Sequence, residues 1–108
     1  MNFDDYQAGA RKTAIYPQDY LITYPALGLV GEAGEIANKV KKILRDDHGV
    51  CSDQKRAQLI EEMGDVLWYL AALASDLDVS LDMIATSNLQ KLSDRATRNA
   101  LSGEGDHR

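Results

Sequence analysis

Apolar residues recur every three or four positions along most of the chain, which is the period of amphipathic helices. No segment alternates apolar and polar residues as a half-buried strand does. The pattern therefore predicts an all-α fold of four helices. We expect them over about residues 2–14, from 25 to the DDHG segment at 46–49, over 53–77 and over 81–101.

Local signals mark the ends of these helices. Asn2, Ser52 and Ser80 are good N-caps, because each carries a side-chain oxygen that can accept a hydrogen bond from the first turn. Pro25 is tolerated in a first turn, and Gly49 follows the polar segment that ends the second helix. These signals support the four boundaries.

A chain of 108 residues allows one modest core, so we interpret residues 1–108 as a single domain with a frayed polar tail over about 102–108. The N-terminus lacks a signal-peptide pattern and no apolar run approaches a membrane span, which predicts a cytoplasmic protein. The single cysteine, Cys51, cannot form an intramolecular disulfide, as is usual in a reducing compartment. The net charge of −5 disfavours general nucleic-acid binding, so a phosphate ligand should arrive with metal ions.

Residues 66–74 read VLWYLAALA, so the third helix is apolar around its whole circumference there. Three short partner helices can hardly bury such a surface. We therefore expect self-association, as a homodimer or as a homotetramer built from two dimers.

Four carboxylates form two pairs with i, i+3 spacing. Glu32 and Glu35 share one face of the second helix, and Glu62 and Asp65 share one face of the third. If these helices pack antiparallel, the pairs converge into one cluster. Oxygen ligands of this kind suit hard cations such as Mg²⁺ or Mn²⁺.

Acidic pairs are also common on solvated helix surfaces, but two features favour a metal site. Gly28 and Gly31 lie on the same side of the helix as the acids, although a glycine inside a helix costs about 1 kcal/mol relative to alanine. Their presence suggests close approach of a ligand or another backbone. In addition, Glu62 and Asp65 directly precede the apolar stretch, where crowded carboxylates are unfavourable without a cation.

The fourth helix offers a second half of the site. Asn88, Lys91 and Arg95 lie within or beside its apolar face, where cations need an anionic partner. They either pair with the acid cluster or contact the phosphates of a ligand. Di-iron chemistry is disfavoured, because neither His48 nor His107 follows a glutamate at Glu-x-x-His spacing.

The ordered motifs resemble the MazG-like family of all-α nucleoside triphosphate pyrophosphohydrolases, and its short, phage-type members in particular. That family's signature is ExxE, a spacer and ExxD. Here GLVGEAGEIANKVKK supplies the first pair, EEMGDVLWYLAAL supplies the second, and 26 residues separate them. The segment NLQKLSDR resembles the closing part of the family pattern.

The resemblance implies a helical bundle that assembles as a dimer or tetramer and hydrolyses nucleoside triphosphates at the α-phosphorus with Mg²⁺ or, in its place, Mn²⁺. The implied catalytic and metal-binding residues are Glu32, Glu35, Glu62 and Asp65. Asn88, Lys91 and Arg95 would contact the leaving pyrophosphate. Trp68 or Tyr69 could stack on the base, although aromatic residues in apolar helices are more often core. Gln7 is a weaker candidate for a base contact, and either Glu35 or Glu61 could accept the proton of the attacking water.

Two other interpretations stay open at this point. A hydrolase specialised for dUTP or dCTP would share the metal motif and differ in its base pocket. A non-catalytic helical association module would carry the same acids as solvated surface. Only an enzyme should bind metal and nucleotide together.

Overall fold

The computed structural model describes residues 1–98, and all secondary structure in that range is helical. The predicted all-α class is confirmed. The elements are α1 (Phe3–Arg11), the 3₁₀ turn η1 (Gln18–Tyr20), α2 (Thr23–Asp46), α3 (Asp53–Asp76) and α4 (Leu81–Thr97). The expected helix end near Leu101 and the frayed tail lie outside the described residues. Over residues 1–98, no helix combines the length and the apolarity that a membrane crossing requires.

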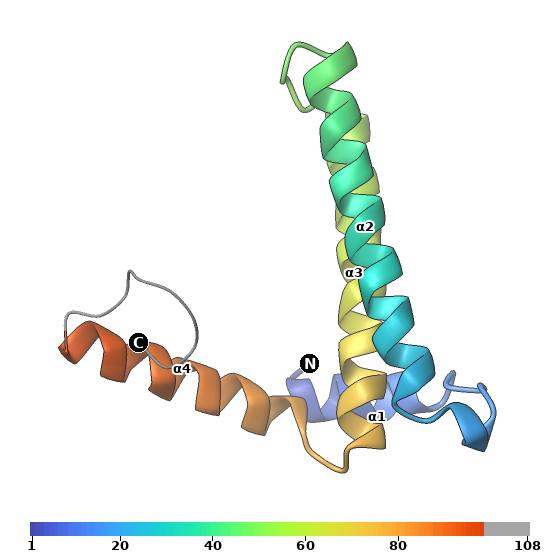
Figure 1. Cartoon of the computed structure of the whole chain (residues 1–108), viewed down its shortest axis with the longest axis vertical. Helices are drawn as coiled ribbons and strands as arrows, with labels where there is room; N and C mark the ends of the chain where they lie inside the picture. Colours follow the sequence, from blue (N-terminus) through green and yellow to red (C-terminus); the bar gives the residue numbers. More distant parts are fainter. Residues whose placement is uncertain (99–108) are drawn as a thin grey trace.

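Two long helices, α2 and α3, form an antiparallel hairpin that is the main axis of the molecule (Figure 1). The connection between them follows the predicted signals. Gly49 adopts a left-handed conformation with φ 78° and its N–H donates to the carbonyl of Ile43 at 3.1 Å, which ends α2. Ser52 then caps α3, because its hydroxyl accepts a hydrogen bond from the N–H of Lys55 at 3.2 Å. The hairpin places the acidic motifs of the two helices side by side.

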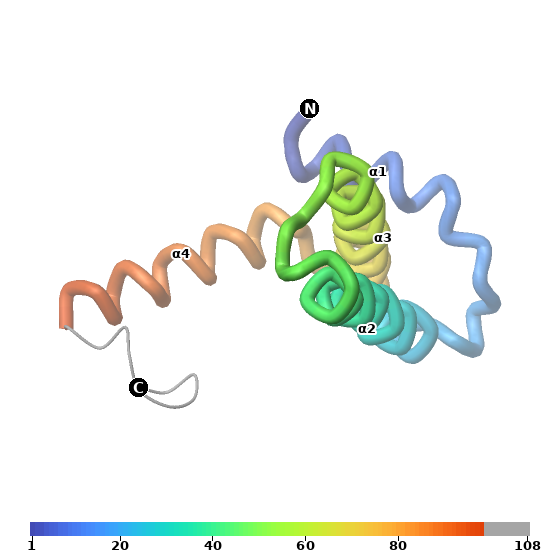
Figure 2. Tube along the Cα trace, turned by 90° about the horizontal axis from the view of Figure 1, so that it is seen from above, coloured from blue at the N-terminus to red at the C-terminus, as the bar shows by residue number. Residues whose placement is uncertain are grey.

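The short helix α1 packs against α3 on the side opposite α2 (Figure 2). Small side chains make this close packing possible. The buried core at this end of the hairpin consists of Ala10, Ala71, Ala74 and Leu81. Tyr6, Trp68 and Val79 are partly buried against it. The alanine side chains in the apolar run of α3 thus pack against α1.

The side chain of Gln7 ties α1 to the turn between α3 and α4. Its amide nitrogen donates to the carbonyl of Val79 at 2.9 Å and to the Ser75 hydroxyl at 3.1 Å. Its amide oxygen accepts from the N–H of Leu81 at 2.8 Å. Gln7 therefore has a structural role at this turn, and its suggested contact with a nucleobase stays a prediction.

Helix α4 begins at the predicted cap, Ser80, and then leads away from the hairpin (Figures 1 and 2). It contacts α1 and α3 near its own beginning. One chain therefore does not close into a four-helix bundle, because the turn before α4, with Asp78 at φ 58°, points the helix outward. Much of its apolar face is exposed, including Met83, Ile84 and Leu89.

Candidate metal centre and aromatic pocket

Three carboxylates meet on the α2–α3 hairpin. Glu32 of α2 and Glu62 and Asp65 of α3 each place one oxygen within 4.8 Å of the others. Glu32 and Glu62 are half-buried, whereas Asp65 is exposed. The predicted convergence of the two acidic motifs is confirmed for these three side chains, because the antiparallel hairpin brings the acidic faces together.

The cluster is electrostatically crowded. A hydrogen bond shared with Glu62 raises the pKa of the Glu32 carboxyl, and desolvation raises it further. The negative charges of Glu62, Asp65 and Glu35 act in the same direction. Such a cluster is relieved either by binding a proton or by binding a cation.

The donor set fits a hard divalent cation. Oxygen ligands about 2.1 Å from Mg²⁺ lie roughly 3 to 4 Å from one another in an octahedral shell, so small side-chain adjustments would suffice here. Glu35 lies outside the set of three converging oxygens, and its side chain is exposed. Its charge nevertheless reaches Glu32, so it stands at the edge of the cluster.

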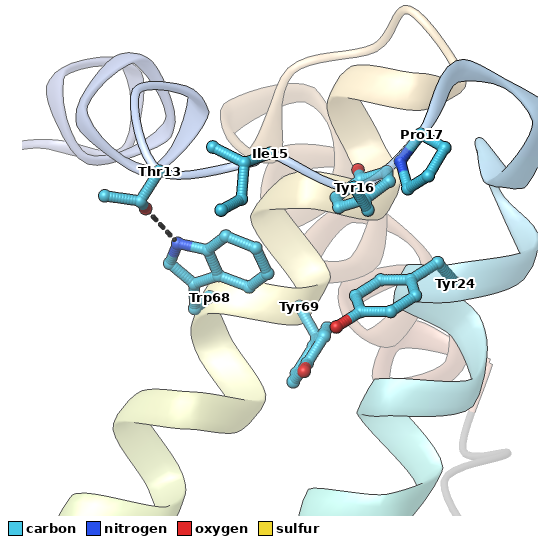
Figure 3. Close-up of a pocket in the computed structure, with 7 residues that line it drawn as sticks. All are labelled: Thr13, Ile15, Tyr16, Pro17, Tyr24, Trp68 and Tyr69. Carbon is cyan, nitrogen blue, oxygen red and sulfur yellow. Dashed lines mark hydrogen bonds between the residues drawn. The ribbon is translucent and has the colours of Figure 1, made fainter.

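An aromatic pocket of about 220 Å³ lies beside the hairpin (Figure 3). The segment between α1 and α2 forms one wall, and helices α2 and α3 form the other. Tyr16 stacks on Tyr24 with ring centroids 4.9 Å apart, and Trp68 meets Tyr69 edge to face at 5.0 Å. The complete lining is Thr13, Ile15, Tyr16, Pro17, Tyr24, Trp68 and Tyr69.

The pocket walls are held by local contacts. The indole N–H of Trp68 donates to the Thr13 hydroxyl at 2.9 Å, which joins α3 to the end of α1. Trp68 and Tyr69 were predicted to be either core or stacking residues, and both line this pocket. The contribution of Thr13–Pro17 and Tyr24 could not be seen in the sequence, because an irregular segment carries no periodic signal.

Tyr69 connects the pocket with the carboxylates. It follows Asp65 by one helical turn, and its hydroxyl points away from Tyr16 and Pro17 (Figure 3). Burial raises the pKa of Tyr69, and Tyr24 raises it further through its charge and a hydrogen bond. The charges of Glu32 and Asp65 add to this shift. Tyr69 is therefore close to both sites.

Asp76 at the end of α3 was not singled out by the sequence, yet it fixes the segment that lines the pocket. Its side chain is 0% exposed and accepts three hydrogen bonds. The donors are the Arg11 guanidinium at 2.9 Å, the Tyr16 hydroxyl at 2.8 Å and the backbone N–H of Ile22 at 2.9 Å. Burial alone would raise the pKa of Asp76, but these hydrogen bonds and the Arg11 charge outweigh it and lower the pKa.

The contacts of Asp76 also stabilise an unusual backbone conformation at Ile22 and the protonated hydroxyl of Tyr16. Ile22 has φ 69°, a left-handed conformation that a β-branched residue adopts only under constraint. Burial and the hydrogen bond to Asp76 raise the pKa of Tyr16 to about 12, so its hydroxyl stays a donor at ordinary pH. Asp76 thereby positions both the pocket wall and the start of α2.

The polar residues of α4 are not brought to the carboxylates within one chain. Asn88 and Lys91 line a separate cavity of about 400 Å³ on α4. Arg95 is only 3% exposed and already has an interaction within its own chain. Figure 1 shows α4 leading away from the hairpin that carries the acids.

Comparison with known proteins gives one family and two relatives. A profile of the MazG nucleotide pyrophosphohydrolase domain matches residues 23–99. "Gene 37 protein" of Mycobacterium phage L5 is 51% identical over 114 residues, which cover 100% of both chains. "Uncharacterized protein YvdC" of Bacillus subtilis (strain 168) is 38% identical over 72 residues, which cover 62% of this chain and 68% of that protein. No solved structure matches the chain.

Proposed function

The chain belongs to the MazG nucleotide pyrophosphohydrolase family, and from this premise we propose that it hydrolyses a nucleoside triphosphate to the monophosphate and pyrophosphate. The observation that carries the proposal is the position of the three-carboxylate cluster beside an aromatic pocket. The cluster suits phosphates that arrive with divalent cations, and the pocket suits a planar base. A nucleotide carries both kinds of group, phosphates and a planar base, in one molecule.

Four side chains would hold the cations. Glu32, Glu62 and Asp65 offer converging oxygens, and Glu35 can extend the set from the edge of the cluster. Mg²⁺ or Mn²⁺ held there would offset the charge of the triphosphate and polarise the α-phosphoryl group. Either Glu35 or Glu61, whose oxygens both lie outside the converging set, would accept the proton of the attacking water. Glu61, the other candidate base, has an exposed side chain on α3.

The aromatic pocket would receive the nucleobase. Its walls offer the faces and edges of Tyr24, Trp68 and Tyr69, which favour stacking over hydrogen-bond recognition. The indole N–H of Trp68 is already bonded to Thr13, so it contributes its ring rather than its donor. Whether the enzyme accepts many bases or one, such as the base of dUTP or dCTP, is decided in this pocket.

A second copy of the chain would complete the assembly. Exposed apolar side chains lie along the hairpin and along α4, and Ile36, Met63, Val66, Leu67 and Leu70 line a cavity without polar surface between α2 and α3. In a symmetric dimer, the α4 helix of each copy covers the hairpin of the other. Asn88 and Lys91 would then reach the triphosphate bound at the other copy's carboxylates.

A turnover screen tests the proposal. Purified protein is incubated with each common ribonucleoside and deoxynucleoside triphosphate in Mg²⁺, and the products are separated by ion-exchange chromatography. At least one substrate should give monophosphate and pyrophosphate, and EDTA should abolish the reaction. A non-catalytic association module would give no product and, in calorimetry, no Mg²⁺-coupled binding of a non-hydrolysable triphosphate.

A further inference from the structure

Gly28 is the glycine of α2 on which another side chain rests. A Cβ built at Gly28 would overlap the ring carbons Cε1, Cζ and Cδ1 of Tyr69. Gly31 and Gly34 of the same helix and Gly64 of α3 have nothing within 4 Å of such a Cβ. The missing side chain at position 28 therefore makes room for one aromatic ring.

That ring has neighbours on its other sides. Trp68 lies 5.0 Å away at an interplanar angle of 90°, and Tyr24 lies 6.3 Å away. A methyl group at position 28 would push the Tyr69 ring by roughly 1.5 to 2 Å before ordinary carbon–carbon contact is restored. Because Gly28 belongs to α2, the ring would move away from that helix, and Trp68, which lines the pocket of about 220 Å³ together with Tyr69, is its neighbour on α3.

We propose that Gly28 is a specificity-determining residue, which seats the Tyr69 ring on α2 and so keeps the aromatic pocket open for the base. It is a positioning residue, since it acts on the ligand through Tyr69. The inference rests on the proposed nucleotide hydrolase function. It predicts that position 28 controls how large a base the pocket accepts, while the carboxylates keep their hold on the metal.

The test compares Gly28→Ala with Gly34→Ala, a matched control on the same helix. Gly28→Ala should raise KM for the best substrate of the turnover screen about tenfold or more, with a larger loss for purine than for pyrimidine nucleotides. Its kcat should change less, and Mn²⁺ binding followed by electron paramagnetic resonance should match the wild type. Gly34→Ala should leave KM, kcat and Mn²⁺ binding unchanged, because its Cβ meets nothing.

Trp68 supplies a readout that does not require turnover, because it is the protein's one tryptophan and touches Tyr69. Gly28→Ala should change its emission spectrum, and Gly34→Ala should not. Wild-type KM together with wild-type emission in Gly28→Ala would overturn the inference. If the wild type hydrolyses no nucleotide, the proposed function fails, and the emission comparison still decides whether Gly28 seats the ring.

Introducing Gly28→Ala into a second variant, Tyr69→Leu, distinguishes the proposed effect from general misfolding. In Tyr69→Leu the ring is absent, so adding Gly28→Ala should cause no further loss of kcat/KM and no further change of emission. An equal loss on adding Gly28→Ala to either background would contradict the proposal, since the effect would then be independent of Tyr69.

Discussion

At the scale of single residues, a substitution of Asp65 distinguishes a metal-binding carboxylate cluster from one with a purely structural role. None of the ion pairs within residues 1–98 includes Asp65, and its charge adds to the crowding around Glu32. Asp65→Asn should therefore leave the stability of the metal-free protein level or raise it, while turnover falls by orders of magnitude. Thermal melts in EDTA, together with activity assays in Mg²⁺, measure both effects on one preparation.

A structural role for Asp65 would give the opposite result. If its charge were needed by a buried cation, the melting temperature in EDTA would fall sharply, by an amount equivalent to about 3 to 5 kcal/mol. Such a loss would remove Asp65 from the metal site. A stable, inactive variant that no longer gains melting temperature from Mg²⁺ and nucleotide would keep it there.

We expect Asp76 to stabilise the fold rather than to take part in catalysis. Asp76→Ala leaves the Ile22 N–H, the Tyr16 hydroxyl and the Arg11 guanidinium without their acceptor, which should cost about 3 kcal/mol or more. Because folding lowers the pKa of Asp76, its contribution is present above the ordinary aspartate range and is lost as pH falls through the lowered pKa. Denaturant melts of wild type and variant should therefore differ at neutral pH and converge in acid.

The control for Asp76 is Asp19→Ala, which removes an exposed aspartate from the same region. It should change the free energy of unfolding little at any pH. A constant difference between Asp76→Ala and wild type down to strongly acidic pH would show that the Asp76 charge does not act as described.

At the scale of helices, the contact between α1 and the start of α4 depends on the side-chain amide of Gln7. Gln7→Met keeps the side-chain length but leaves the Leu81 N–H and the Val79 carbonyl without a partner, at a cost of about 2 kcal/mol. Hydrogen exchange followed by mass spectrometry should show faster exchange in α1 and the first turn of α4. The tip of the hairpin around Gly49 should exchange as in the wild type, and a uniform increase along the chain would contradict this local role.

The helices and the acid cluster could be predicted because their signals are local. Ser52 and Ser80 cap helices where the sequence placed caps, and i, i+3 spacing puts the acids of each pair on one face of its helix. The antiparallel hairpin then brings Glu32, Glu62 and Asp65 together. The direction of α4 could not be predicted, because it depends on Gln7 bonding to a turn more than 70 residues later. The contacts of Asp76 with the α1–α2 segment are equally remote in sequence.

At the scale of the whole molecule, the proposed dimer can be tested by mixing two inactive chains. If Lys91 acts on the other copy's substrate, a mixture of Asp65→Asn and Lys91→Ala should regain activity, because each mixed dimer has one intact site. Random exchange predicts about a quarter of the wild-type rate. No recovery after denaturation and joint refolding would contradict a site shared between copies.

Self-association itself is measured by light scattering. The wild type should have at least twice the chain mass of 11.9 kDa at micromolar concentration. Leu70→Glu places a charge on the exposed apolar surface of α3 and should shift the protein toward the monomer. Val50→Glu, in the exposed connection between α2 and α3, is the control and should not. A wild-type protein that is a monomer would contradict the assembly.

The position of water attack tests the central claim most directly. Hydrolysis of the best nucleoside triphosphate in ¹⁸O-labelled water with Mg²⁺, followed by mass spectrometry of the products, shows which phosphorus receives the oxygen. Attack at the α-phosphorus predicts that the label appears in the nucleoside monophosphate and that the pyrophosphate stays unlabelled. Label in the pyrophosphate, or release of orthophosphate with a nucleoside diphosphate, would contradict the account.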